Sequence, residues 1–512
     1  MRRICKVLFS RYAISAIMIL LEVAVTVFLF ISIPSSVYSF IILSLILEII
    51  AFIGLINKDA NPEYKASWSA VILFLPIAGA VLYFLFYERR ISKKEGAIIR
   101  KSILDMRAIP QSDENREALA RLAVADPLAA GKARAIISDD PLAQIYVGTD
   151  AKYFPTGEEY FEALISDIQA AEKFIYLEYF IIDEGELWDR VHDEIRKKAS
   201  EGVEVRVLFD DIGCMSTLPR GYEMKLRREG ISAHRFARVN PRVSSVHHNR
   251  DHRKIAVVDG NIAYTGGVNI ADEYVNLKMR FGHWKDGGVR VVGECAVGLL
   301  KLFLSSWDAT AGQLSDYRAL LSPMGGSLGR GYFIPFGSGP APIYRRAVAK
   351  NMFLNIINQS TSFVYITTPY LIIDYDLTEA LCNAACRGVD VRIITPEIPD
   401  KKTVKLMTKS AYPHLIKSGV RIYEYKGGFI HEKLVLSDDK YGVFGTVNLD
   451  YRSLAHHFEC GVWCYGSPIL EHARDEYEKT LAHSREITEG EARLTLTERI
   501  VRNAIRIFAP LL

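Results

Sequence analysis

Cysteine is scarce in this sequence, and its spacing argues against the roles that cysteine clusters usually play. The 512 residues contain seven cysteines, and no two have the C-x-x-C spacing of a redox or zinc motif. They are Cys5, Cys214, Cys295, Cys382, Cys386, Cys460 and Cys464. We therefore expect reduced thiols in the core of a protein that faces the cytosol, and no metal site.

A large excess of charge is also missing. Lys and Arg total 63 and Asp and Glu total 60, which gives a formal net charge of +3. Proteins that bind nucleic acid usually carry a strongly basic surface. An excess this small does not favour such a partner, so we expect none.

The sequence does contain one set of six polar and small residues that occurs in two copies. The first copy consists of His252, Lys254, Asp259, Gly266, Gly267 and Asn269. The second copy, at the same offsets from its histidine, consists of His431, Lys433, Asp438, Gly445, Thr446 and Asn448. One H-x-K triplet carries no information, but six matched positions that occur twice indicate an internal duplication.

The spacing predicts a pair of strands in each copy. A His and a Lys two residues apart lie on the same side of an extended segment. The apolar run 255–258 predicts a buried strand, Asp259 a turn, and the run 262–265 a second strand that ends in small residues. The second copy repeats this pattern at 434–437 and 441–444. Small residues allow a ligand to approach the backbone closely, which favours a binding site there.

The motif H-x-K-x4-D, followed by G-G/T-x-N, resembles the signature of the phospholipase D superfamily. The runs N-R-D-H-R-K-I-A-V-V-D-G (249–260), G-T-V-N-L-D-Y-R-S-L (445–454) and L-P-I-A-G-A-V-L-Y-F-L-F (75–86) resemble bacterial cardiolipin synthases in particular. The resemblance extends from about residue 68 to the C-terminal Pro510-Leu511-Leu512. One departure is His457, which stands where these synthases commonly carry Asn and bears on substrate selectivity.

The resemblance implies an α/β fold with two phospholipase D-type α/β/α lobes that share one active site, preceded by N-terminal transmembrane helices. Strand-like and helix-like patterns also alternate along the chain, which predicts a largely parallel sheet covered on both sides. The strand-like runs are 174–182, 202–209, 363–373 and 388–394, and the helix-like runs are 187–200 and 377–387. We expect a polar linker at 89–145, a first lobe at 146–320 and a second at 321–512.

The N-terminal region, residues 1–88, is predicted to be a membrane anchor with two or three spans. Its apolar stretches 7–33, 37–56 and 68–86 approach the ~20 residues that cross a bilayer. Cationic residues cluster before the first stretch and after the third, and three full spans cannot leave both clusters inside. The cluster after residue 88 is the larger. We therefore expect a multi-pass protein of the bacterial inner (cytoplasmic) membrane, with its catalytic domain in the cytoplasm.

Two histidines and two lysines suit chemistry on a phosphodiester. A neutral imidazole attacks phosphorus to form a phosphohistidine, while a protonated imidazole donates to the leaving alcohol and later accepts the proton of the incoming one. The two copies are symmetric in sequence, and the resemblance implies His252 as nucleophile and His431 as general acid and base. Lys254 and Lys433 neutralise the phosphate oxygens. This chemistry needs no metal and no cofactor.

The remaining motif residues are assigned supporting parts. Asp259 and Asp438 complete the catalytic motif, and we expect them to hold the turns rather than to react. Gly267, Asn269, Thr446 and Asn448 are the expected substrate-binding residues. The resemblance implies that Asp286 and Glu459 each orient an imidazole, as the acid of a catalytic triad does. A surface salt bridge is the alternative for both.

Two further features each allow two interpretations. Lys401, Lys402, Lys405 and Lys409 form either a solvated face or a lip that attracts lipid head groups. The stretch 499–512 is predicted to be an amphipathic helix that docks on the core or lies in a membrane interface.

The resemblance implies a cardiolipin synthase. Such an enzyme transfers a phosphatidyl group from one phosphatidylglycerol to another through a phosphohistidine and releases glycerol. A hydrolytic phospholipase D, or a transferase that uses another alcohol, is the alternative. The expected partners are phosphatidylglycerol and membrane lipids, and the oligomeric state stays open.

Overall fold

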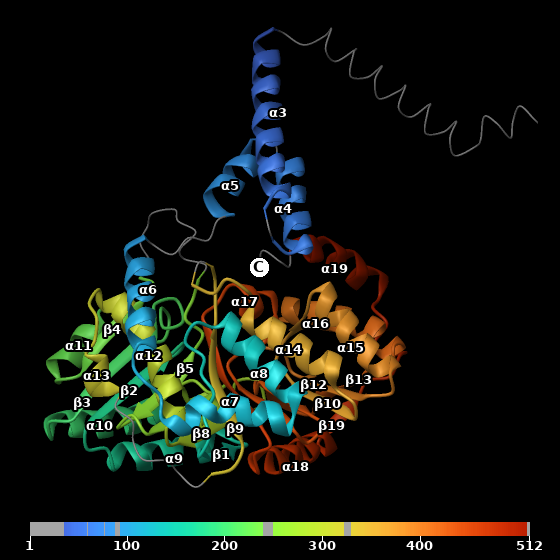
Figure 1. Ribbon diagram of the computed structural model, residues 1–512. Helices are drawn as coiled ribbons and strands as arrows, with labels where there is room; N and C mark the ends of the chain where they lie inside the picture. Colours follow the sequence, from blue (N-terminus) through green and yellow to red (C-terminus); the bar gives the residue numbers. More distant parts are fainter. Residues whose placement is uncertain are drawn as a thin grey trace, which may run out of the picture. The chain divides into compact units, whose positions relative to one another are not determined.

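The computed structural model describes residues 35–58, 60–75, 77–87, 93–238, 249–321, 329–341 and 343–508. The chain divides into two compact units, Met1–Tyr87 and Glu88–Leu512. Figure 1 shows both units and labels many of their helices and strands.

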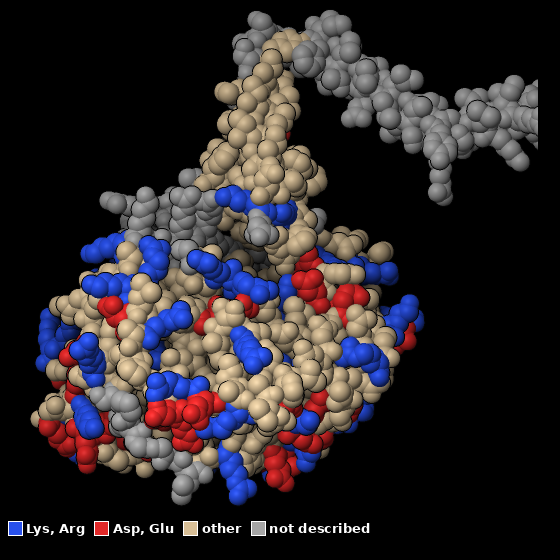
Figure 2. Space-filling view, in the orientation of Figure 1, with Lys and Arg blue, Asp and Glu red and all other residues tan. Residues whose placement is uncertain are grey.

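The first unit contains helices α3 (Ser35–Ile56), α4 (Pro62–Phe74) and α5 (Ala78–Phe86). Exposed apolar side chains such as Ile42, Leu43 and Ile49 cover α3. Figure 2 shows that the visible face of this unit has almost no charged side chains. Nevertheless, none of the helices in the described part of the chain is both long and apolar enough to cross a membrane. The predicted stretch 7–33 lies outside the described residues.

The third apolar stretch is not one helix. We expected 68–86 to be one of two or three membrane spans, but α4 ends at Phe74 and α5 begins at Ala78. The break contains Pro76, which has no amide hydrogen to continue the helix, and Ile77 has a φ of 61°. A Cβ on Gly79 would lie 2.2 Å from the Val71 carbonyl oxygen, so the two helices meet too closely for a side chain there.

The described strands of the second unit form two large sheets with the same plan. The first sheet has the order β1 (Asp150–Phe154), β8 (Gly288–Val292), β6 (Ile262–Gly266), β5 (Lys254–Val258), β2 (Phe174–Tyr179), β3 (Glu204–Asp210) and β4 (Ser232–Phe236). The second has the order β19 (Ser484–Glu486), β13 (Arg421–Tyr425), β12 (Asp390–Pro396), β10 (Phe363–Thr367), β15 (Leu434–Ser437), β16 (Tyr441–Gly445), β18 (Glu459–Tyr465) and β9 (Tyr332–Ser338). Apart from β19, the second sheet repeats the first, so the duplication extends to the fold.

The sheets are mixed rather than largely parallel, which corrects our expectation. In the first sheet β2, β3 and β4 are parallel, whereas β5, β6, β8 and β1 each run antiparallel to a neighbour. The reason lies in the motif itself. Asp259 and Gly260 have φ values of 53° and 79°, so a tight turn joins β5 directly to β6 as a hairpin.

Helices cover the sheets and fill the space between them. They are α6 (Lys93–Arg107), α7 (Asp113–Ala125), α8 (Pro127–Asp139), α9 (Gly157–Gln169), α10 (Glu186–Ser200), α11 (Tyr222–Arg228), α12 (Cys295–Ala311), α13 (Tyr317–Leu320), α14 (Val348–Gln359), α15 (Tyr375–Cys386), α16 (Lys402–Lys417), α17 (Tyr451–Ala455), α18 (Ile469–Ala482) and α19 (Leu496–Phe508). Residues 93–139, in the stretch expected to be a linker, thus form three helices, with Met106 and Leu122 fully buried.

One hydrophobic core joins the two lobes. Helix α12 is buried on almost every side, and its Leu299 and Phe303 belong to the same core as Ile255 of the first sheet and Leu434 and Val462 of the second. Because both lobes bury apolar surface in this core, it fixes them together and aligns the ends of their strands. All six cysteines in the described part of the chain are free thiols, five of them buried and Cys386 exposed.

Candidate active site

The segment before each motif histidine pairs with the other lobe. In the second lobe, β14 (Gly428–Ile430) runs parallel to β7 (His283–Lys285) of the first, and the His431 amide donates to the Lys285 carbonyl at 2.8 Å. In the first lobe, the His252 amide donates to the Phe458 carbonyl at 2.9 Å. The residues that follow Lys285 and Phe458 are Asp286 and Glu459, so each lobe supplies an acid beside the other lobe's histidine.

The two imidazole–carboxylate pairs are therefore crossed between the lobes. His252 Nδ1 lies 2.9 Å from Glu459 Oε1, and His431 Nδ1 lies 2.6 Å from Asp286 Oδ2. All four side chains are buried. An imidazole that donates from Nδ1 keeps its lone pair on Nε2, which is the atom that attacks or accepts a proton.

The two lysines lie against the backbone of their own histidines. Lys254 Nζ donates to the His252 carbonyl at 2.7 Å. Lys433 Nζ donates to the His431 carbonyl and also lies 2.9 Å from His431 Nε2. Burial lowers the pKa of Lys254 to about 8 and that of Lys433 to about 7, although Glu459 and Asp286 oppose the shift. At neutral pH the site thus holds its cations close to the point of losing their protons.

Burial also controls the protonation of the other groups. It lowers the pKa of His252 well below its usual value, with help from the charge of Lys254, and it lowers the pKa of His431 to about 4, with help from Lys433. Burial raises the pKa of Glu459 to about 8. Lys433 and His431 also contribute to the shift at His252, so the groups of both lobes act within one site.

The small residues of the two motifs have different contacts. A Cβ on Gly267 would lie 2.1 Å from Asp286 Oδ1, so only glycine leaves room for this carboxylate. The matching residue of the second lobe, Thr446, fills the space with a hydroxyl that donates to Glu459 Oε2. We expected both residues to bind substrate. Their observed contacts are with the two acids, and contact with substrate stays a prediction.

The two asparagines also differ. Asn269 Oδ1 accepts from the Ile181 amide at 3.0 Å, and Asn269 Nδ2 lies 2.6 Å from the Tyr274 hydroxyl. These contacts tie the loop after β2 to the site. Asn448 is buried, and its Oδ1 has no hydrogen-bond partner among the described residues. A buried polar atom without a partner is costly, which makes Asn448 the better candidate for contact with substrate.

The motif aspartates lie at the opposite ends of their strands from the histidines. Asp259 accepts hydrogen bonds from the amides of Glu172, Lys173 and Phe174 at 2.7 to 3.0 Å. Asp438 does the same with the amides of residues 361–363. Both therefore anchor the turn of the hairpin to the start of the neighbouring strand, as the sequence indicated, and neither contacts the two histidines.

Between each His and Lys lies a charged residue that the sequence analysis missed. Arg253 points into the core, where it donates to the Glu459 carbonyl at 3.2 Å and to the Tyr344 hydroxyl at 3.0 Å. Glu432 accepts from the hydroxyl of Tyr153 in the first lobe. The alternation of an extended segment turns these side chains away from the lysines, and their charge at such buried positions was the only signal in the sequence.

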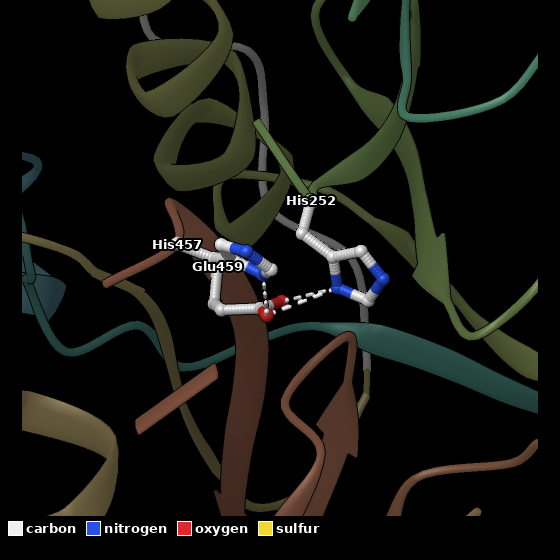
Figure 3. A group of neighbouring side chains, drawn as sticks. All are labelled: His252, His457 and Glu459. Atoms are coloured by element: carbon white, nitrogen blue, oxygen red, sulfur yellow. Dashed lines mark hydrogen bonds and ion pairs between the residues drawn. The ribbon is translucent and has the colours of Figure 1, made fainter. Parts of the chain in front are cut away.

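One group of side chains has the composition of a metal site. The ligand atoms of His252, His457 and Glu459 all lie within 4.8 Å of one another, and Figure 3 shows both imidazoles beside the same carboxylate. Two imidazoles and a carboxylate suit a zinc ion. Such an ion would compete with the contact between Glu459 and His252 Nδ1, because it would bind the same carboxyl group.

Comparisons with known proteins show the family of this chain. The family model described as the phospholipase D-like domain of cardiolipin synthase matches residues 164–280 and 353–481, and a phospholipase D-nuclease N-terminal model matches residues 46–86. The cardiolipin synthase of Alkalihalophilus pseudofirmus is 31% identical over 90% of this chain and 92% of its own length. This chain belongs to the cardiolipin synthase family. The family is part of the phospholipase D superfamily, and both histidine motifs lie within the residues that the family model matches.

Two other relatives complete the comparison. An uncharacterized protein of Streptococcus mutans is 37% identical over 90% of this chain and 98% of its own length. Among solved structures, the phosphatidylserine synthase of Haemophilus influenzae superposes with a TM-score of 0.55, covering 70% of this chain and 93% of its own, at 17% identity. At that identity the likeness establishes the α/β fold with two phospholipase D-like lobes and nothing about the substrate.

Proposed function

We propose that the protein synthesises cardiolipin by transferring a phosphatidyl group from one phosphatidylglycerol to another, with release of glycerol. The observation that carries the proposal is the crossed pair of imidazoles in a chain of the cardiolipin synthase family. Each imidazole has a carboxyl group beside Nδ1 and a lysine at its backbone. These are the groups that one displacement at phosphorus and its reversal require.

In the first step, His252 Nε2 attacks the phosphorus of the donor lipid. His252 suits this role because burial and Lys254 keep its imidazole neutral. The P–N bond forms as the bond from phosphorus to the glycerol oxygen breaks, and His431 gives its proton to that oxygen. In the second step, the hydroxyl of the acceptor lipid passes its proton to His431 and attacks phosphorus, and the P–N bond breaks.

The general acid must gain a proton before the first step. A pKa of about 4 leaves His431 neutral in the free site at pH 7. A bound phosphodiester is anionic and lies among two lysines, so its charge favours the protonated forms of His431 and Lys433. Asp286 acts in the same direction, because its charge raises the pKa of His431. We propose that binding of the anionic substrate raises the pKa of His431, so that the imidazole is protonated before the first step.

The proposed division of the chain follows from this function. Residues 1–88 would form a membrane anchor with two or three spans, 89–145 would connect it to the catalytic lobes 146–320 and 321–512, and the lobes would face the cytoplasm. The apolar surface of α3 supports contact of the first unit with lipid. Both substrates and the product are lipids, so an anchored enzyme would meet them without extracting them from the bilayer.

The test is lipid analysis after the detergent-purified protein has been incubated with phosphatidylglycerol alone, beside a His252→Ala control. We expect cardiolipin and free glycerol in equal amounts, both absent with the control. Phosphatidic acid without cardiolipin would instead make the enzyme a hydrolase. Products that form only when another alcohol is added would make it a transferase with a different acceptor.

A further inference from the structure

A cavity of about 360 Å³ lies in the second lobe among β11 (Leu371–Ile372), β17 (Leu449–Asp450), α16, α17 and α19. One part of its wall is apolar, with Ile372, Val404 and Met407. Helix α19 contributes Ile505 from the C-terminal segment. Neither histidine motif contributes a residue to this wall, so the cavity is separate from the groups that perform the chemistry.

The cavity nevertheless reaches the catalytic groups of the second lobe. The ring of Tyr370, in its wall, lies 6.5 Å from the ring of Phe429, which lies 5.8 Å from the ring of His431. Asp450, also in the wall, is close enough to Lys433 for their charges to interact. Burial raises the pKa of Asp450, and the charge of Lys433 opposes this shift. One intervening ring, that of Phe429, thus separates the cavity wall from His431.

The polar part of the wall carries two cations and one acid. Lys401 and Arg452 are exposed, so they can meet an anion without being dehydrated first. Asp450 Oδ1 accepts from the Ser453 amide at 2.9 Å, which caps α17 and fixes the carboxylate in place. A ligand that fits these groups combines an anionic phosphate, free hydroxyls and an apolar body.

We propose that this cavity binds the acceptor lipid, a phospholipid whose head group has free hydroxyls, with Asp450 on the hydroxyls and Lys401 and Arg452 on the phosphate. The inference rests on the proposed function and extends it to the second substrate. The reacting hydroxyl passes its proton to His431, its oxygen bonds to phosphorus, and the bond from phosphorus to His252 breaks. The position of the cavity on the His431 side places the acceptor beside the group that takes its proton.

Free glycerol provides the comparison that tests this site. Glycerol has the reacting hydroxyls but no phosphate, so Lys401 and Arg452 distinguish the lipid acceptor from glycerol. The enzyme would be incubated with phosphatidylglycerol and labelled glycerol. Label entering phosphatidylglycerol measures transfer to glycerol, and cardiolipin measures transfer to the lipid. We expect Lys401→Gln/Arg452→Gln to lower the ratio of cardiolipin formation to glycerol exchange at least about tenfold, the loss expected for charged hydrogen bonds.

Two further variants complete the experiment. Lys402→Gln removes an exposed cation of α16 next to Lys401 and outside the cavity wall, so its ratio should match that of the unaltered enzyme. Asp450→Asn keeps a residue that caps helices well. It should lower transfer to both acceptors, because both present hydroxyls.

The outcomes separate the inference from the proposed function. If the unaltered enzyme makes cardiolipin and the double variant keeps the same ratio as Lys402→Gln, the acceptor binds elsewhere and the inference is wrong. An equal loss of both activities in the double variant would also overturn it. If the unaltered enzyme exchanges glycerol but makes no cardiolipin, the proposed function fails, and the inference fails with it.

Discussion

In the first lobe, the short carboxylate of Asp286 lies against the bare backbone of Gly267, whereas in the second lobe Thr446 donates its hydroxyl to the longer Glu459. Both arrangements deliver a carboxylate oxygen to Nδ1 of a histidine, at 2.6 Å for His431 and 2.9 Å for His252. The electrostatic settings nevertheless differ, because the charge of Asp286 raises the pKa of His431, whereas burial raises the pKa of Glu459, the acid beside His252, to about 8. The two halves of the site thus share one geometry but differ in their electrostatics, which suits the proposed nucleophile and the proposed acid.

Removal of either histidine tests whether the halves have separate roles. We expect His252→Ala and His431→Ala each to lower cardiolipin synthesis at least about 10⁴-fold, because both act in each displacement. With a donor lipid labelled in its phosphate, His431→Ala should still accumulate label on His252, since the nucleophile remains. Rapid acid quenching and mass analysis of the peptides would locate it. Label on position 431 in the His252→Ala variant would reverse the assignment.

Replacing each acid by its neutral amide tests whether Asp286 and Glu459 contribute differently to activity. Asp286→Asn removes the charge that raises the pKa of His431, and we expect a loss of about 10³-fold in kcat. Glu459→Gln should cost only about tenfold at pH 7, because a carboxyl with a pKa of about 8 is already mostly neutral in the free site. Steady-state rates at pH 7 give both values. Equal losses of kcat in the two variants would show that Asp286 and Glu459 contribute equally to catalysis.

The small residues offer a test of shape. Gly267→Ala would place a methyl group 2.1 Å from Asp286 Oδ1, and the displaced acid should cost about 10²-fold in kcat. Thr446→Ser keeps the hydroxyl donated to Glu459 and should stay within about threefold, while Thr446→Ala should lose about tenfold. Thermal unfolding of each variant would show whether the folded state survives. Full activity of the Gly267→Ala variant would show that the close contact between Gly267 and Asp286 is not needed for catalysis.

The pKa values of the two lysines predict how the activity of the enzyme falls at high pH. The pKa of Lys433 is about 7 and that of Lys254 about 8 in the free site, and a lysine that loses its proton no longer neutralises phosphate. We therefore expect kcat/KM to fall as the pH rises through this range. In the complex, the anionic substrate stabilises the charged lysines, so kcat should fall at a higher pH. Coincident profiles for kcat and kcat/KM would contradict this explanation.

A zinc ion should bind on the His252 side of the active site and not on the His431 side. The ligand atoms of His252, His457 and Glu459 lie within 4.8 Å of one another, so we expect added Zn²⁺ to inhibit. His457→Asn should weaken the inhibition about tenfold and leave the rate without zinc nearly unchanged. Titration of both proteins with zinc, followed by chelation, measures this. Equal sensitivity of the two proteins would exclude His457 as a ligand.

Much of the site was predictable because its chemistry is local in sequence. Equal spacing in the two copies singled out His252, Lys254, His431 and Lys433, and the turn residues correctly predicted a turn between two strands in each copy. Composition indicated free thiols. The strand-like runs predicted to begin at residues 174 and 363 also coincide with the starts of β2 and β10. Each of these features depends on residues within one strand or one turn.

What the sequence did not reveal depends on contacts between distant segments. No local pattern indicates that Asp286 supports His431 or that Glu459 supports His252, because the exchange arises from the pairing of β7 with β14 and of residue 251 with Phe458. The antiparallel half of each sheet was missed for a related reason. Alternating helices and strands suggested parallel pairing, whereas the hairpins reverse the chain without a helix.

The crossed main-chain pairing has a consequence for the history of such a chain. A single lobe has a histidine but not the acid that orients it, so one copy of the repeat can work only beside a second copy. Two identical copies would be bound to carry the same acid and the same small residue in both halves. Joining the copies in one polypeptide removes that constraint. Each half is then free to change by separate mutations, and a symmetric ancestor could have become an enzyme with one nucleophile and one proton donor.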